Sequence, residues 1–166
     1  MLNKATVLHE LGQAKIVHLR WVKRVDHLVS GLPVEKDLIS IDPTQCGFGK
    51  WLYGPIGEKL RSEYIFESTI YKIETYHDRI HELYGEIYNI LYAAPASRTI
   101  LHKIVTLGSK KVSKADRERV KSYFEVLLEY SDEMLALLVK LEKAVKAVDM
   151  VVLQRREQMA EQHMHL

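Results

Sequence analysis

The chain has 166 residues, of which 47% are apolar and 28% are charged, and its formal net charge is +2. This length and composition are those of a soluble globular protein with one domain and a sizeable core. The single cysteine excludes an internal disulfide framework and fits a reducing cytosol. The apolar run from Leu135 to Val139 is far shorter than the ~20 residues that a membrane helix needs, and the N-terminal residues show no secretory pattern.

Apolar residues recur every three or four positions through most of the chain, and no strand pattern is apparent. Asn3 can cap the first helix, and Ser113, three residues before Asp116, can cap the last. We predict an all-α protein, an antiparallel four-helix bundle over residues 1–153 with a short extra helix after the cysteine, followed by a polar, frayed tail over 154–166. The predicted helices span residues 3–30, 48–53, 58–92 (with a break near Tyr64), 97–107 and 113–152.

The predicted helices carry narrow seams of inward-facing residues. The seam of the last helix alternates in steps of four and three over more than four heptads, which is typical of a coiled coil or bundle. Lys15 and His18 interrupt the first seam, and both need partners because an unsatisfied buried polar group costs about 1–3 kcal/mol. Gly85, inside the 58–92 helix, either permits the close approach of a neighbour or has no special task. The expected seams are Leu8, Leu11, Lys15, His18, Val22, Val25 and Val29; Ile70, Ile73, His77, Ile80, Tyr84, Ile87 and Leu91; and Val120, Phe124, Leu127, Ser131, Met134, Leu138, Leu141, Val145, Val148 and Val152.

Four side chains are of the kind that binds zinc. Cys46 lies in a turn flanked by glycine, and His77 and His81 are four residues apart, so that they project from one helix face. With His18 they make three imidazoles and one thiolate, a complete ligand set for tetrahedral zinc. In a bundle, His18 and the His77/His81 pair would lie on facing helices, with the Cys46 turn closing the site. From these residues alone the other interpretation stays open, namely satisfied core histidines and an inert buried cysteine.

Three motifs occur in order: His18-Leu19-Arg20-Trp21, Cys46-Gly47-Phe48-Gly49-Lys50-Trp51-Leu52 and His77-Asp78-Arg79-Ile80-His81. They resemble the chemoreceptor zinc-binding domain, a family with a His-x-x-Trp, a Cys-x-Phe-Gly-x-Trp and a His-x-x-x-His element in this order. The resemblance covers about residues 1–95, and the last helix only as a generic bundle partner. It implies that zinc is bound by His18, Cys46, His77 and His81. Trp21, Phe48 and Trp51 are expected to pack around the site and keep water out.

The resemblance implies a bacterial cytoplasmic sensory module, attached to chemotaxis receptors or diguanylate cyclases and often dimeric. Such a domain would respond to zinc level or to oxidation of the zinc-held thiolate, and would relay the change through its helices. We expect a homodimer, with a chemotaxis or cyclic-di-GMP signalling partner. We expect no catalytic activity, because four protein ligands leave no open position on the metal. The alternative is a helical dimerisation or interaction module in which zinc is purely structural or not bound.

Two further patterns point to other classes of protein. A di-iron bundle enzyme needs a Glu-x-x-His pair on each of two helices. The chain offers Glu74 with His77 but no second pair on its long helices, so this class is set aside. Residues 98–121 hold eight Lys or Arg against two acidic residues. We interpret this segment as a solvated connector in preference to a docking surface, and expect no nucleic-acid binding because no recognition motif accompanies it.

Overall fold

The computed structural model describes residues 3–34, 39–92 and 112–148, and this part of the chain is all-α, as predicted. Within it no helix is long and apolar enough to span a bilayer. The predicted helix over 97–107, the tail over 154–166 and most of the basic segment lie outside the described residues. The helices are α1 (Lys4–Val29), α2 (Gly47–Leu52), α3 (Pro55–Ser62), α4 (Tyr64–Tyr92) and α6 (Lys114–Ala147).

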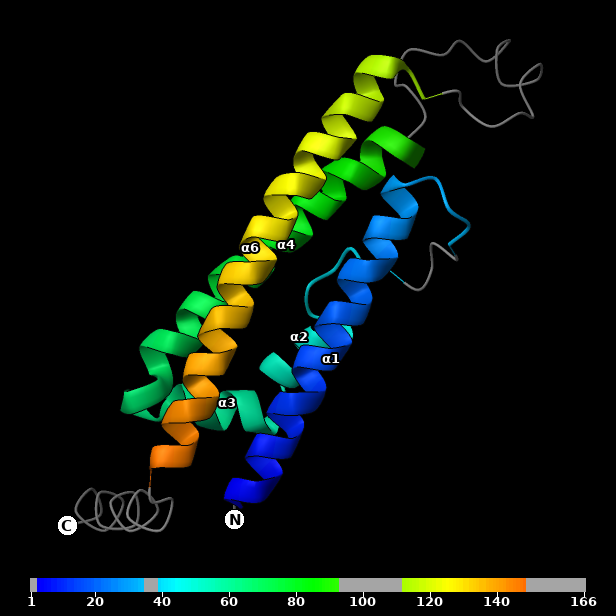
Figure 1. The fold of residues 1–166 in the computed structure, drawn as a ribbon. Coiled ribbons are helices and arrows are strands. Elements are labelled where there is room, and N and C mark those ends of the chain that lie inside the picture. The colour runs from blue at the N-terminus through cyan, green and yellow to red at the C-terminus, as the bar shows by residue number, and fades with distance from the viewer. Residues whose placement is uncertain (1–2, 35–38, 93–111, 149–166) are drawn as a thin grey trace, which may run out of the picture.

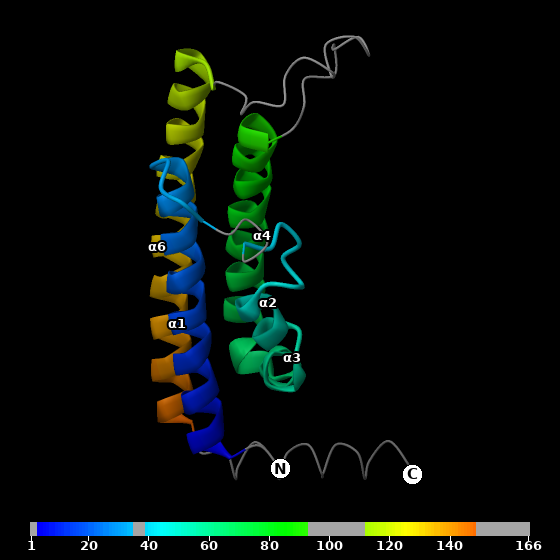
Figure 2. The ribbon, with the colours of Figure 1, turned by 90° about the vertical axis from the view of Figure 1, so that its right-hand side faces the viewer.

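The three long helices α1, α4 and α6 lie side by side, with α6 antiparallel to the other two (Figure 1). The chain returns from the end of α1 to the start of α4 through a leg that contains the short helices α2 and α3. Seen from the side, α1 and α6 form one layer, and α4 with α2 and α3 forms the other (Figure 2). Helix α1 packs against α6 and α2, whereas α4 packs against α6 and α3. The centre of the molecule is therefore enclosed by side chains from both layers.

The helix ends follow local capping chemistry. The Asn3 side chain accepts a hydrogen bond from the backbone N–H of Ala5 at 2.9 Å, and the Ser113 hydroxyl accepts one from Asp116 at 3.0 Å. Both predicted caps are confirmed. The break between α3 and α4 falls at Glu63, next to the predicted position, but α3 begins at Pro55, earlier than predicted. Proline suits the first turn of a helix because its missing N–H has no partner there.

The seam of α6 agrees with the prediction from Val120 to Val145, but Val148 caps the end of the helix and is only partly buried, and Val152 lies outside the described residues. The seam of α1 agrees in part, at Leu11, His18, Val22 and Val25. Leu8, Lys15 and Val29 were expected to face inward, but each is partly exposed, and Lys15 instead contacts Glu142 on α6. Since α1 packs against both α6 and α2, it buries a wider face than one seam provides. The buried residues of α1 are Val7, Leu11, Ala14, His18, Trp21, Val22, Val25 and Leu28. Those of α6 are Val120, Phe124, Leu127, Ser131, Met134, Leu138, Leu141 and Val145.

The seam of α4 is also wider than predicted. His81 is buried beside His77, while Leu91 is only partly buried. A Cβ atom placed on Gly85 would meet no atom within 4 Å, so no neighbour approaches this glycine closely. The buried residues of α4 are Phe66, Ile70, Ile73, His77, Ile80, His81, Tyr84, Ile87 and Ile90.

Candidate metal centre

Cys46 is the cap residue at the start of α2 and is only 6% exposed. Its sulfur accepts a hydrogen bond from the backbone N–H of Gly49 at 3.1 Å and lies 3.3 Å from the carbonyl oxygen of Pro43. A Cβ atom on Gly49 would lie 1.8 Å from that same carbonyl oxygen. The turn therefore closes only with glycine at this position, and the closed turn fixes the direction of the sulfur.

His77 and His81 lie one helical turn apart on the buried face of α4, with their ring centroids 4.7 Å apart. The sulfur of Cys46 lies 3.2 Å from Nε2 of His77, although 31 residues separate the two in the sequence. One ligand atom from each of Cys46, His77 and His81 lies within 4.8 Å of the other two, and all three residues are buried. The structure thus brings together three of the four predicted ligands.

His81 is oriented by the loop that precedes the cysteine turn. Its Nδ1 lies 2.9 Å from the carbonyl oxygen of Ile41, which can only accept a hydrogen bond, so Nδ1 carries the proton. In the neutral ring Nε2 then holds the free lone pair. Metal-binding histidines commonly donate their second nitrogen to a carbonyl in this way. His77 has no such support, because its buried Nδ1 finds no partner among the described residues.

His18, the fourth predicted ligand, lies beside this group but is not a member of it. It is 2% exposed, and its Nε2 is 2.9 Å from the hydroxyl oxygen of Ser131 on α6. The Phe48 ring contacts both His18 and His77, with centroid distances of 5.8 Å and 4.9 Å. His18 as a zinc ligand therefore stays a prediction, with its ring close to the centre but bonded elsewhere.

Burial keeps His18 and the three clustered ligands uncharged near neutral pH. Desolvation, with a smaller contribution from neighbouring imidazoles, lowers the pKa of His18 to about 4 and that of His77 to about 3. Desolvation also lowers the pKa of His81 and raises that of the Cys46 thiol. Neutral imidazoles have lone pairs available for a metal ion. A bound cation would place positive charge next to the buried sulfur of Cys46 and so stabilise its thiolate form.

The donor set fits zinc. Zinc prefers thiolate and imidazole ligands, and with bonds of about 2.0–2.3 Å the ligand atoms of a tetrahedral site lie roughly 3.3–3.8 Å apart. The sulfur–nitrogen distance of 3.2 Å is already near that range, and the largest separation in the group is within 4.8 Å. Zinc would hold Cys46, His77 and His81 with small movements, and a fourth ligand would complete the site.

Aromatic side chains surround the group. Trp21 of α1 stacks against His81 with a centroid distance of 4.8 Å, and its indole N–H donates to the carbonyl oxygen of Ser40 at 3.4 Å. Trp51 packs on Phe48 at 5.4 Å, one layer further from the imidazoles. Large apolar rings exclude water and so strengthen the interactions between a metal ion and its ligands.

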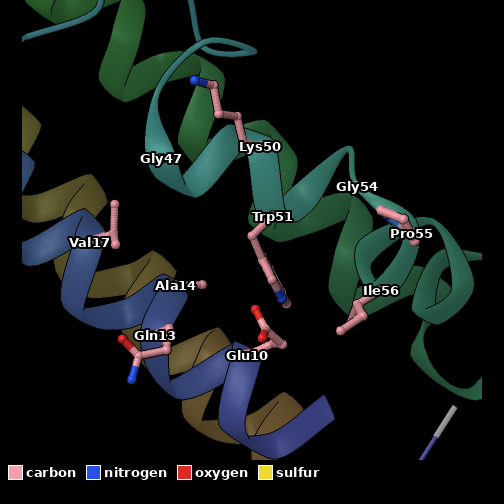
Figure 3. A pocket seen from close by; sticks show the side chains of 10 residues that line it. All are labelled: Glu10, Gln13, Ala14, Val17, Gly47, Lys50, Trp51, Gly54, Pro55 and Ile56. Carbon is pink, nitrogen blue, oxygen red and sulfur yellow. The ribbon is translucent and has the colours of Figure 1, made fainter. Parts of the chain in front are cut away.

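A cavity of about 340 Å³ separates α1 from α2 and α3 beside the cysteine turn (Figure 3). The Trp51 side chain points from α2 toward Glu10 of α1, and its buried indole N–H has no partner within the described part of the chain. At the other edge the helices are in tight contact, because a Cβ on Gly47 would lie 2.3 Å from Val17. The contact of α2 with α1 is therefore tight at Gly47 and open beside Trp51, although Phe48 and Leu52 are fully buried.

Sequence reasoning missed two groups that hold the predicted ligands, the carbonyl of Ile41 and the hydroxyl of Ser131. No sequence signal marks a backbone carbonyl. Ser131 did stand out as the one polar member of the predicted α6 seam, although its partner was not foreseen. Glu74, which forms the Glu-x-x-His pattern with His77 in the sequence, pairs with Arg61 at 2.8 Å.

Comparison with known proteins agrees with this geometry. A family model described as "Chemoreceptor zinc-binding domain" matches residues 18–88, which begin at His18 and include Cys46, His77 and His81. The characterised proteins and the solved structures compared with the chain gave no match. The family binds zinc and is a sensory module, not a catalytic family. Residues 18–88 of this chain are therefore a chemoreceptor zinc-binding domain, with zinc as its cofactor.

Proposed function

We propose that this chain is a zinc-dependent signalling module in which zinc occupancy is relayed through the helices. The observation that carries the proposal is the buried group of Cys46, His77 and His81, whose ligand atoms lie within 4.8 Å of one another. These ligands come from two segments, the start of α2 and the middle of α4. Zinc would tie the two together, because binding to a site that joins separate segments is coupled to their folding.

The proposed relay runs from the cysteine turn to α6. Cys46 caps α2 and packs against the Pro43 turn, so a change at its sulfur changes the start of α2. The cavity between α1 and α2 leaves room for α2 to shift. Helix α6 packs against both α1 and α4, and would respond when these are drawn together or released. We take α2 and α3 together as the fourth leg of a four-helix bundle.

Two stimuli fit this site, zinc level and oxidation of the thiolate. Burial raises the pKa of the Cys46 thiol, so a metal-free thiol here is mostly protonated and reacts slowly with oxidants. Zinc would hold the sulfur as thiolate, which hypochlorous acid converts to sulfenic acid with release of chloride. An oxidant response would therefore require the zinc-loaded form. A protein that responds to zinc level alone would be unaffected by oxidant at constant zinc.

We further propose that the domain acts in the cytoplasm as a homodimer, coupled to a chemotaxis or cyclic-di-GMP signalling partner. The unpaired Cys46 supports a reducing compartment. The apolar seam of α6 is buried within the chain, so a second copy would need another surface. Ile16 and Leu19 of α1 are 42% and 50% exposed and could contribute to one. Sedimentation equilibrium tests this part, and a monomer at all concentrations would contradict it.

Metal analysis of protein purified without added zinc tests the proposed function. We expect about one zinc per wild-type chain and a large loss in Cys46→Ala, with Lys140→Ala, at an exposed position on α6, as control. His163 and His165 in the tail could bind stray metal, so a chain lacking residues 154–166 should be measured in parallel. Cobalt substitution should add thiolate charge-transfer bands and tetrahedral bands. Wild type and Cys46→Ala that are equally metal-free would end the proposal.

A purely structural zinc is the second candidate, and the burial of all three clustered ligands favours it. The two candidates differ in whether α6 responds. Hydrogen exchange on α6 that is the same with and without zinc would favour the structural role. A change in α6 would favour signalling.

A further inference from the structure

The buried face of α6 has a single polar member among the described residues. Seven of its eight buried residues are apolar, and the eighth is Ser131, which is 3% exposed. Its hydroxyl oxygen lies 2.9 Å from Nε2 of His18, and this contact joins α6 to α1. A buried hydroxyl without a partner destabilises the fold, as does a buried imidazole nitrogen without one. Each of the two groups therefore satisfies the other.

His18 stands between two possible partners. Three ligands are already gathered in the layer of α2 and α4, while the His18–Ser131 pair belongs to the layer of α1 and α6 (Figure 2). Tetrahedral zinc needs a fourth ligand, and the His18 ring lies near His77, because the Phe48 ring contacts both. His18 is not in the ligand group, so it must move to join the metal.

We propose that Ser131 is the metal-free partner of His18, and that zinc binding exchanges their hydrogen bond for a bond from the imidazole lone pair to zinc. The Ser131 hydroxyl keeps its proton in this exchange and loses its partner. Zinc occupancy then changes a contact of α6, a helix that contributes none of the three clustered ligands. Ser131 is thus a positioning residue that opposes zinc binding and reports it to α6. The inference rests on the proposed zinc site.

A supporting role for Ser131 would have the opposite sign. If Ser131 held His18 in place as a ligand, its removal would weaken zinc binding about 10–100-fold, as loss of such supports does elsewhere. If Ser131 competes with zinc, its removal costs the metal-free state a hydrogen bond and relieves the loaded state of an unpaired hydroxyl. Both effects strengthen zinc binding. The direction of the change therefore separates the two roles.

Ser131→Ala tests the inference in the full chain, with zinc affinity measured by competition against a chromophoric chelator. We expect affinity to rise about two- to twelve-fold, the equivalent of one hydrogen bond. Ser122→Ala, at an exposed position on the same helix, is the matched control and should leave affinity unchanged. In a His18→Ala background, Ser131→Ala should have no effect on zinc affinity.

NMR of the imidazole nitrogens gives a second readout. Ser131→Ala should shift the His18 ring signals in the metal-free protein and leave them nearly unchanged in the zinc-loaded protein. Zinc affinity that falls or stays the same in Ser131→Ala would overturn the inference while leaving the zinc site intact. A wild-type chain that takes up no zinc would overturn the inference and the proposed function together.

Discussion

The contact between α4 and α6 differs in kind from the contact between α1 and α2. The first is lined by apolar side chains, and Leu127, Met134 and Leu138 of α6 are fully buried. The second contains a glycine-dependent turn, a cavity and a buried indole N–H without a partner in the described residues. Apolar packing of the first kind gives stability without ligands, whereas the second is incomplete by itself. We therefore expect the helices α4 and α6 to form a scaffold that is stable without zinc, and the leg of α2 and α3 to depend on the proposed metal centre for its order.

The scaffold should resist changes in zinc but not the loss of a core side chain. Leu138→Ala removes a fully buried side chain from α6, and we expect it to lower the free energy of unfolding by about 2–5 kcal/mol. The loss should be similar with and without zinc, as measured by urea unfolding. Val139→Ala, at a neighbouring side chain that is 44% exposed, should cost much less. If the Leu138→Ala effect vanished in the zinc-loaded protein, the stability of α6 would depend on zinc. That result would contradict the distinction between scaffold and leg.

Removal of zinc should act on the leg. A ligand present at about a thousand times its dissociation constant stabilises the folded state by ~4 kcal/mol, and a chelator removes that stabilisation. We expect amide exchange to rise most in α2 and in the turn around Cys46, and least in the buried middle of α4 and α6. Hydrogen–deuterium exchange with mass spectrometry measures both. A uniform rise in exchange over all helices would show that the two regions unfold as one unit.

Gly49→Ala should break the cysteine turn specifically. The new methyl group would lie 1.8 Å from the carbonyl oxygen of Pro43, and relief of such overlap typically costs about 1–3 kcal/mol and would displace the sulfur of Cys46. We expect lower stability and a marked loss of zinc affinity.

Gly85→Ala is the matched control, because a Cβ there meets nothing within 4 Å. Alanine in that helix interior should raise the free energy of unfolding by about 0.4–1 kcal/mol. Equal zinc affinity in the two glycine variants would contradict the role assigned to the turn.

The smallest expected effect comes from the ion pairs of Glu142 on α6. Glu142 contacts Lys15 of α1 and Lys146 of its own helix. Hydrogen bonds from Lys146 and Lys15 lower the pKa of Glu142 to about 2. Because the folded-state pKa of Glu142 is below its unfolded value, its contacts with the two lysines stabilise the fold above about pH 4.5. This contribution disappears as the pH falls toward 2. The site is solvent-accessible, so the contribution is below about 1 kcal/mol. Glu142→Gln should lose it at pH 6 and not at pH 2.

Features that depend on neighbours along the chain could be predicted from the amino-acid sequence. The caps at Asn3 and Ser113, the break before α4 and the apolar row of α6 all follow from local hydrogen bonding and helical periodicity. The ordered motifs around Cys46 and His77 also named side chains that meet in space, because the family pattern carries that information.

How wide a face of α1 is buried, and which group each polar side chain contacts, depends on the tertiary packing. The sequence could not indicate that Lys15 turns outward to Glu142, that Ser131 holds His18, or that Gly49 packs against a carbonyl. The apolar periodicity of a helix is a property of its own sequence and does not depend on its neighbours. It identifies the buried face correctly only when a single neighbour packs against that helix. Where two neighbours share a helix, as α6 and α2 share α1, the arrangement of the neighbours selects the partners.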